Sequence, residues 1–302
     1  MKNNAFLTVF IAFIASTFLF SCSKHQNEQI PKEVMEEICP TCKAEKFWLP
    51  EGSTIEYNLE KDATEIVITA PEGYLYYGLA ADSSLITWKE KESGGNTVTV
   101  TCKCTDGDAE KCNPVGNDGS VKCVISPGCN SCDRIEKAKS QVTKQEYEIL
   151  TGGFVNPGIG VTFAEPNEEL PYAFEALLEY PEVKAQLESF MLQFYDNLSD
   201  IPSLNINETS ISAPSGYKFV ILNVYGRALT ILLPESKDIT SAGGYHYTCP
   251  CNGTSGVCKV KNKFGYYFCT KPDSNPCNKA CNTMTIEDDI TNTIYSYTFY
   301  YF

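Results

Sequence analysis

TCKCTDGDAEKCNPVGNDGSVKCVISPGCNSC, residues 101–132, recurs in altered form as TCPCNGTSGVCKVKNKFGYYFCTKPDSNPCNKAC, residues 248–281. We call these stretches the first and second cysteine segments. The steps between successive cysteines are 2, 8, 11, 6 and 3 residues in the first segment and 2, 7, 11, 8 and 4 in the second. Six cysteines in one order with nearly equal steps indicate a repeated unit.

The similarity begins upstream of the cysteines. APEGY, residues 70–74, and APSGY, residues 213–217, stand 32 and 36 residues before the first cysteine of their segments. Around both motifs lie short stretches that are rich in β-branched and aromatic residues and bounded by Gly, Pro, Asp or Ser, which predict strands. The predicted strands are residues 54–59, 65–70, 74–79, 85–89 and 97–101, and then 217–225, 229–233 and 244–248.

Two further features complete the predicted fold. The turn residues between the third and fourth cysteines of each segment predict a hairpin whose arms carry those cysteines. Residues 172–179 and 182–197 place apolar side chains at helical spacing, and we expect this apolar face to pack on the second sheet.

The fold class that follows is mainly β (α+β). It has two tandem small antiparallel β modules, each with a disulfide-stapled cysteine-rich segment, joined by a helical connection. The predicted divisions are a signal peptide at 1–21, a tether at 22–38, the first module at 39–140, a connector with an amphipathic helix at 141–205 and the second module at 206–302.

Cysteine chemistry dominates the candidate sites. The chain has 15 cysteines, and setting aside Cys22 in the N-terminal signal leaves 15 − 1 = 14. An even number suits disulfides, which short, turn-rich segments need because they bury too little apolar surface to fold alone. Six cysteines allow 15 connectivities, and the spacing does not choose among them. The candidates are Cys39, Cys42, Cys102, Cys104, Cys112, Cys123, Cys129, Cys132, Cys249, Cys251, Cys258, Cys269, Cys277 and Cys281.

Metal binding and thiol redox chemistry stay open as alternatives. C-x-C and C-x2-C pairs can chelate zinc or an iron–sulfur cluster, but neither segment has the spacing of a zinc ribbon or a common ferredoxin. Cys39 and Cys42 have the C-x2-C spacing of thiol oxidoreductases without a strand before them or a clear helix after them, so we favour a structural bridge. We therefore predict no metal site and no cofactor.

Composition narrows the function. A formal net charge of -14 repels phosphate backbones, which makes nucleic acid a poor partner. A nucleophilic triad needs a base, and the folded part offers only His246, because His25 lies in the tether. No G-x-S-x-G, H-E-x-x-H or phosphate-binding loop is present, so we assign no catalytic residue. A hydrolase with a carboxylate pair is a third alternative.

The N-terminus resembles the signal and lipobox of bacterial lipoproteins. One positive charge at Lys2 precedes an apolar run at 5–20, which ends in Leu19-Phe20-Ser21-Cys22, although Phe20 departs from the usual small residue. The resemblance implies that Cys22 is lipidated and becomes the first residue, which anchors the protein to a membrane. Ser23 after it resembles the pattern of lipoproteins sorted to the outer membrane.

The repeated C-x-C…C…C…C-x2-C pattern resembles poorly characterised cysteine-rich lipoproteins of Bacteroidota. This resemblance implies an envelope location and no defined activity. We therefore expect a lipid-anchored cell-envelope protein with a non-catalytic binding or surface-structural role, whose partner is a glycan, a peptide or another protein. The alternative is a thiol-redox or metal-binding envelope protein that uses Cys39 and Cys42 or the repeated cysteines.

Overall fold

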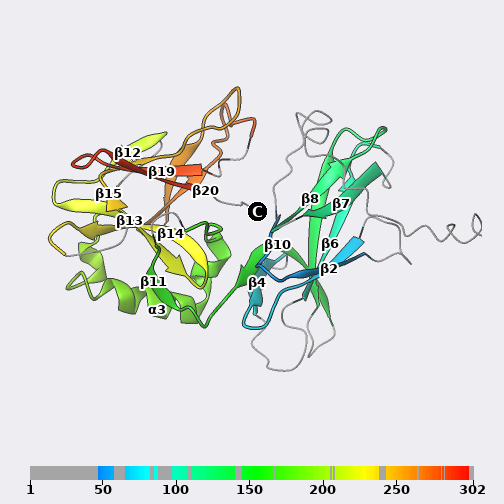
Figure 1. Ribbon diagram of the computed structural model, residues 1–302, viewed down its shortest axis with the longest axis horizontal. Coiled ribbons are helices and arrows are strands. Elements are labelled where there is room, and N and C mark those ends of the chain that lie inside the picture. Colours follow the sequence, from blue (N-terminus) through cyan, green and yellow to red (C-terminus); the bar gives the residue numbers. More distant parts are fainter. Residues whose placement is uncertain are drawn as a thin grey trace, which may run out of the picture. The chain divides into compact units, whose positions relative to one another are not determined.

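The structure is a computed structural model of the chain (Figure 1). It describes residues 47–57, 65–81, 85–87, 97–107, 111–117, 119–139, 145–165, 168–204, 206, 208–237, 243–263, 265–279, 281 and 283–298. The predicted signal peptide, the tether, the lipidated Cys22 and the Cys39/Cys42 pair lie outside these residues. The described part is mostly β, in antiparallel sheets, with little helix, as the strand pattern predicted.

The first sheet has seven strands in the order β2-β3-β6-β9-β10-β4-β5. Alternate residues of β3 and β6 are buried, as expected for a sheet with one face on a core. That core includes Ile66, Val100, Tyr76 and Phe154. The strands are β2 (Thr54–Tyr57), β3 (Glu65–Thr69), β4 (Leu75–Ala80), β5 (Leu85–Thr87), β6 (Thr97–Cys104), β9 (Cys132–Lys139) and β10 (Glu146–Val155).

A three-stranded sheet contains the hairpin of the first cysteine segment and one short strand from outside it. Its order is β1-β8-β7, formed by β1 (Phe47–Trp48), β7 (Cys112–Asn117) and β8 (Ser120–Ile125). Phe47 pairs with Val121 across β1 and β8 and is fully buried in the same core as Tyr76 and Phe154. The short strand β1 therefore ties the hairpin β7–β8 to the first core.

The second half of the chain forms two more antiparallel sheets. A six-stranded sheet runs β11-β13-β14-β18-β17, with β15 added beside β13, and a four-stranded sheet runs β12-β16-β19-β20. The six-stranded sheet contains β11 (Val161–Phe163), β13 (Tyr217–Val224), β14 (Arg227–Pro234), β15 (Gly243–Gly244), β17 (Lys259–Lys263) and β18 (Tyr266–Thr270). The four-stranded sheet contains β12 (Ser210–Ser212), β16 (His246–Thr248), β19 (Thr283–Asp288) and β20 (Thr293–Thr298).

Strand β13 is buried on both faces. Val220, Leu222 and Val224 belong to one hydrophobic core, while Phe219 and Ile221 belong to another, which follows from the two-residue period of a strand. The first of these cores contains α3 (Pro181–Met191), and the second contains residues of β16 and β19. Figure 1 shows α3 and β19 on either side of β13 and β14. The six-stranded sheet is thus the middle layer of the second half.

The predicted helical region folds as η2 (Glu175–Glu179), α3 and η3 (Leu198–Asp200). Val183, Leu187 and Met191 are buried against β13 and β14, which confirms the predicted packing of the apolar face. The helix ends at Met191, six residues before the predicted limit at 197. Beyond it, the buried Tyr195 donates a hydrogen bond to the Leu232 carbonyl at 2.7 Å, so the chain has turned towards the sheet.

Strand β10 begins at Glu146, after residue 140 where we expected the first module to end, and it still belongs to the first sheet. It pairs with both β9 and β4, so the seven-stranded sheet extends to Val155. Gly152 and Gly153 resemble a loop in the sequence, but Gly152 lies opposite Gly78 in the ladder. A Cβ at Gly152 would lie 2.6 Å from the Tyr76 hydroxyl and 2.7 Å from the Tyr77 carbonyl. This glycine therefore serves close packing within a strand and does not mark a turn.

Candidate functional site

The six disulfides of the described residues follow one rule. Each joins a cysteine to the third one after it in the same segment, so that the first pairs with the fourth, the second with the fifth and the third with the sixth. Both segments use this one of the 15 arrangements that the sequence left open. The pairs are Cys102–Cys123, Cys104–Cys129 and Cys112–Cys132 in the first segment, and Cys249–Cys269, Cys251–Cys277 and Cys258–Cys281 in the second.

The strands that hold the cysteines also correspond. In the first segment, β6 carries the first two cysteines and pairs antiparallel with β9, which begins at the sixth. In the second, β16 precedes the first two cysteines and pairs antiparallel with β19, which follows the sixth. The third and fourth cysteines lie on or beside the hairpins β7–β8 and β17–β18, which confirms the predicted hairpins.

The upstream motifs form the same turn. The Tyr74 N–H donates to the Pro71 carbonyl at 3.2 Å, and the Tyr217 N–H donates to the Pro214 carbonyl at 3.0 Å. Gly73 and Gly216 have φ of 91° and 83° at the third position of these turns. Glu72 and Ser215, at the second position, do not have a positive φ, so both turns are type II, and glycine adopts the positive φ without strain.

In each segment a polar side chain holds together the two loops beside the disulfide between the second and fifth cysteines. This side chain comes from one loop in the first segment and from the other loop in the second. In the first segment, Asp106 Oδ1 accepts the backbone N–H groups of Asn130 and Ser131 at 2.9 and 3.0 Å. These bonds, above all the one from Asn130, hold the pKa of the Asp106 carboxyl below its usual value. In the second segment, the side chain lies on the other loop: Asn278 Oδ1 accepts the N–H groups of Thr254 and Ser255 at 3.1 and 3.4 Å.

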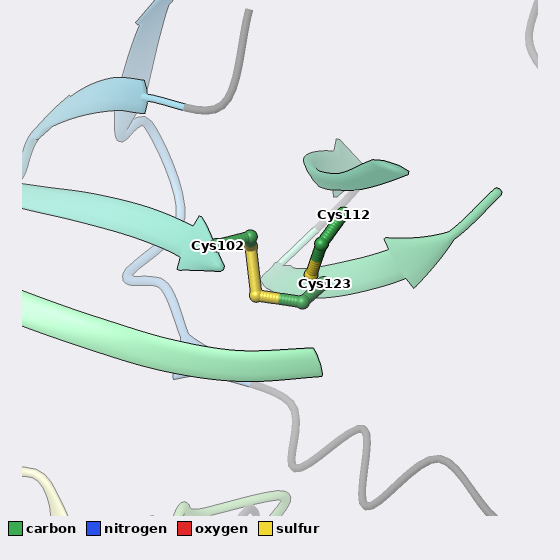
Figure 2. Close-up of side chains that lie close together, drawn as sticks. All are labelled: Cys102, Cys112 and Cys123. Atoms are coloured by element: carbon green, nitrogen blue, oxygen red, sulfur yellow. A yellow bond between two sulfur atoms is a disulfide. The ribbon is translucent and has the colours of Figure 1, made fainter. Parts of the chain in front are cut away.

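Sulfur atoms of neighbouring disulfides lie close together. The Sγ atoms of Cys102, Cys112 and Cys123 are all within 4.8 Å of one another, as are those of Cys251, Cys258 and Cys277 (Figure 2 shows the first group). Such spacing would suit a metal ion if the cysteines were thiolates. Here each sulfur is bonded to another sulfur, so it is not a thiolate ligand in the oxidised protein.

A buried group of ionisable side chains lies in the first core. Glu136 accepts a hydrogen bond from the Tyr76 hydroxyl at 2.6 Å and forms an ion pair with Arg134 at 3.1 Å. Burial raises the pKa of the Glu136 carboxyl and that of the Tyr76 phenol. A perturbed carboxyl marks many active sites. Tyr76 is fully buried and Glu136 nearly so, which makes this carboxyl a partner of core groups rather than half of an accessible carboxylate pair.

Arg227 on β14 is also fully buried, without an accessible face. Its Nε and Nη2 donate to the Phe154 carbonyl at 2.9 and 2.7 Å, and its guanidinium lies 4.9 Å from the ring centroid of Trp48. Burial lowers the pKa of Arg227 to about 9. The side chain joins β14 to the end of β10, which indicates a structural role.

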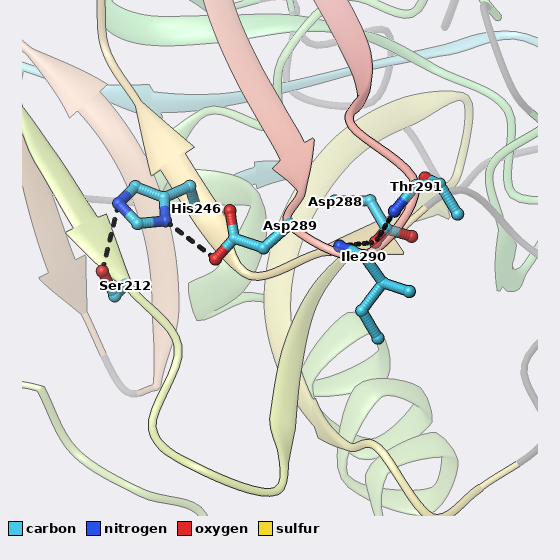
Figure 3. A network of polar contacts seen from close by, with 6 residues as sticks. All are labelled: Ser212, His246, Asp288, Asp289, Ile290 and Thr291. Atoms are coloured by element: carbon cyan, nitrogen blue, oxygen red, sulfur yellow. Dashed lines mark hydrogen bonds and ion pairs between the residues drawn. The ribbon is translucent and has the colours of Figure 1, made fainter.

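Ser212, His246 and Asp289 form a row that the sequence pattern did not predict. Ser212 Oγ lies 3.2 Å from His246 Nε2, and His246 Nδ1 lies 3.4 Å from Asp289 Oδ2. Figure 3 shows the imidazole between the hydroxyl and the carboxylate, with one ring nitrogen facing each. The sequence singled out His246 as the available base, but its partners depend on strand register, which no local spacing encodes.

No protein-family model, curated protein or solved structure matches the chain. Among the described residues, no helix has both the length and the apolarity that a membrane span requires.

Proposed function

We propose that the chain is an exported, lipid-anchored protein of the bacterial cell envelope. Its two disulfide-stapled β modules would serve a binding or surface-structural role outside the cytoplasm. The observation that carries the proposal is the common connectivity of the six disulfides. The lipobox-like sequence before Cys22 supports the anchor.

The disulfides argue for folding in an oxidising compartment. Each closes a loop with a sequence separation of 20 to 26 residues. Closing such loops stabilises a fold by roughly 2–4 kcal/mol per bond. Six bonds together rival the net stability of about 5–15 kcal/mol that a whole domain retains. A chain whose stability depends on disulfides matures in an oxidising compartment outside the cytoplasm, because disulfides persist there.

We also propose that the two modules arose by tandem duplication. The equal cysteine order, the equal connectivity, the two type II turns and the corresponding strand pairs all support it. Two linked copies of a binding module can hold a repeated ligand more tightly than one copy, because the second contact becomes intramolecular. A repeating glycan, a peptide or a protein surface therefore remains the expected partner.

The anchor is tested by fractionating cells that produce the full chain. Wild type is expected in the membrane fraction with a mass increased by acyl chains, and Cys22→Ala is expected to lose both properties. Ser23→Ala is the matched control, because it changes the neighbouring residue and keeps the acylated thiol. If Cys22→Ala stays in the membrane fraction with an unchanged mass, the anchor at Cys22 is wrong.

The redox alternative has a separate test. The full chain is treated with iodoacetamide before and after reduction, and its peptides are mapped by mass spectrometry. Complete protection of the cysteines before reduction supports a structural role for the disulfides. Alkylation of Cys39 and Cys42 in the unreduced protein would instead favour a thiol-redox function.

A further inference from the structure

The pairing of β12 with β16 places Ser212 directly opposite His246. The Ala213 N–H donates to the Tyr245 carbonyl, and the Cys249 N–H donates to the Thr209 carbonyl. These bonds make Ser212 and His246 a non-hydrogen-bonded pair, in which facing side chains come closest. The contact between Ser212 Oγ and His246 Nε2 is therefore set by the register of the sheet.

Asp289 is held on the other side of the imidazole by the turn that follows β19. His246 pairs with Glu287 across β16 and β19, and Asp289 lies two residues further on. Asp288 Oδ1 accepts the N–H groups of Ile290 and Thr291 at 2.9 and 3.2 Å, which shapes this turn (Figure 3). An N–H on Nδ1 facing Asp289 leaves the lone pair of Nε2 for the Ser212 hydroxyl.

We propose that Ser212 is a nucleophile for acyl transfer from carboxylic esters, with His246 as its base and Asp289 as the residue that positions the imidazole. Ser212 Oγ attacks the ester carbonyl carbon while His246 Nε2 takes the hydroxyl proton. The bond to the leaving alcohol breaks, and His246 returns the proton to that oxygen. Water then attacks the acyl-serine by the same route, so that an ester and water yield an acid and an alcohol.

The site is accessible from solvent. Ser212 is exposed, and the side chains of His246 and Asp289 are 42% and 53% exposed. Strand β12 is an edge strand of its sheet, and the backbone N–H of Ser212 points away from β16 as a donor on that outer side. Solvent screens the exposed Asp289 carboxylate, so we expect activation at the low end for a general base, about 100-fold or less.

The first half of the chain lacks this base. Thr69 is the residue before the APEGY motif, as Ser212 is the residue before APSGY. The Thr69 hydroxyl lies 3.3 Å from that of Thr97, its partner across β3 and β6. At this position the first half has two facing hydroxyls, Thr69 and Thr97. The second half has a hydroxyl that faces an imidazole, Ser212 and His246. The proposed acyl transfer belongs to the second half alone.

The test uses the full chain, a fluorophosphonate probe and p-nitrophenyl acetate. Peptide mapping is expected to place the phosphonate on Ser212, and Ser212→Ala is expected to remove it. His246→Gln is expected to slow labelling and ester cleavage at least about 10-fold. Ser210→Ala is the matched control, since Ser210 lies on the same face of β12 opposite Thr248 and is expected to change neither rate.

Asp289→Asn tests the positioning role through the split between kcat and KM. Ester cleavage by this variant is expected to have a lower kcat and an unchanged KM, because Asp289 contacts the imidazole and not the ester. Labelling of Ser212 no faster than that of Ser210, or ester cleavage unchanged in Ser212→Ala, would overturn the proposal and leave a polar row on the surface. Circular dichroism and a count of free thiols confirm that each variant is folded.

Discussion

The two cysteine segments have the same disulfides but different surroundings. In the second, five of the six cysteines are members of a hydrophobic core with Tyr247, Met284 and Ile286. In the first, five cysteines are buried as well, yet none belongs to a hydrophobic core of the described residues. The core nearby instead contains Phe47, Tyr76 and Phe154. The same cross-links therefore reinforce apolar packing in one segment and replace it in the other.

This difference separates two contributions that usually occur together. A disulfide restricts the unfolded chain, and a buried sulfur also fills apolar space. The loops closed by corresponding bonds are similar in length, with separations of 20 for Cys112–Cys132 and 23 for Cys258–Cys281. The chain-entropy contribution is thus nearly equal in the two segments, and packing makes the difference.

Removing the bond between the third and sixth cysteines should have the largest effect of the substitutions that we predict. Cys112→Ala with Cys132→Ala is expected to lower the free energy of unfolding by about 3 kcal/mol. Cys258→Ala with Cys281→Ala should cost about 1 kcal/mol more, because it also opens space in a packed core. Chemical denaturation of the two double variants measures both values. Equal losses would show that packing around the second segment adds nothing.

Full reduction extends the same test. After reduction, backbone amides of the first segment are expected to exchange with solvent as fast as in an unfolded chain. Amides of β13 and β14 should exchange more slowly than those of the first segment, since their residues are buried on both faces without any disulfide between them. Hydrogen exchange read by mass spectrometry distinguishes the two regions. Protection that persists across residues 101–132 would contradict the comparison.

A glycine in each segment offers a second comparison. A Cβ on Gly107 would meet the Gly128 carbonyl, and a Cβ on Gly256 would meet the Pro276 carbonyl; each carbonyl belongs to the residue before the fifth cysteine. Gly256 also has a φ of 83°, whereas Gly107 has no positive φ. Gly256→Ala should therefore destabilise the fold by roughly 1–3 kcal/mol, and Gly107→Ala by less.

Thermal denaturation of these two variants gives the ranking. Gly119→Ala is a useful reference, because Gly119 has a φ of 76° and a Cβ there would meet nothing within 4 Å. The loss of stability in Gly119→Ala measures the free-energy cost of placing a side chain on a left-handed backbone, without any clash. A loss in Gly107→Ala larger than that in Gly256→Ala would show that the close approach, and not the backbone conformation, dominates.

The fold class followed from local patterns in the sequence. Strands such as β3 and β6 were predictable because their buried residues alternate, and the helix because Val183, Leu187 and Met191 recur at helical spacing. The turn residues between the third and fourth cysteines predicted the hairpins of both segments. All these signals lie within a few residues of the structure they specify.

The strand position of Gly152 and the missed side-chain row have another origin. Gly152 is a strand residue because Tyr76 fills the space beside it, and that contact joins residues far apart in the chain. The row from Ser212 to Asp289 depends on the register of β12, β16 and β19. The choice among 15 connectivities depends on which strands meet. Register and tertiary contact are thus what the local sequence pattern did not contain.

The smallest expected effect concerns the loops beside the disulfides between the second and fifth cysteines. The acceptor of the loop hydrogen bonds is a carboxylate in the first segment and a side-chain amide in the second. The hydrogen bond from the Asn130 N–H keeps the pKa of Asp106 below its ordinary value of 3.8. A lowered pKa in the folded state means that this contact stabilises the fold above the pKa of the unfolded chain. The contribution disappears as pH falls through the folded pKa. Asn278 does not titrate in this range, so acid should loosen the first loop and leave the second unchanged.

Nuclear magnetic resonance at decreasing pH measures this difference. The amide protons of Asn130 and Ser131 are expected to shift together below pH 3.8, because their acceptor becomes protonated. Those of Thr254 and Ser255, which donate to Asn278, should show no such titration. Asp106→Asn converts the first loop to the amide chemistry of the second and should abolish the shift. A titration that survives in Asp106→Asn would assign the acid response to another carboxyl, and the two segments would then differ only in which loop carries the side chain.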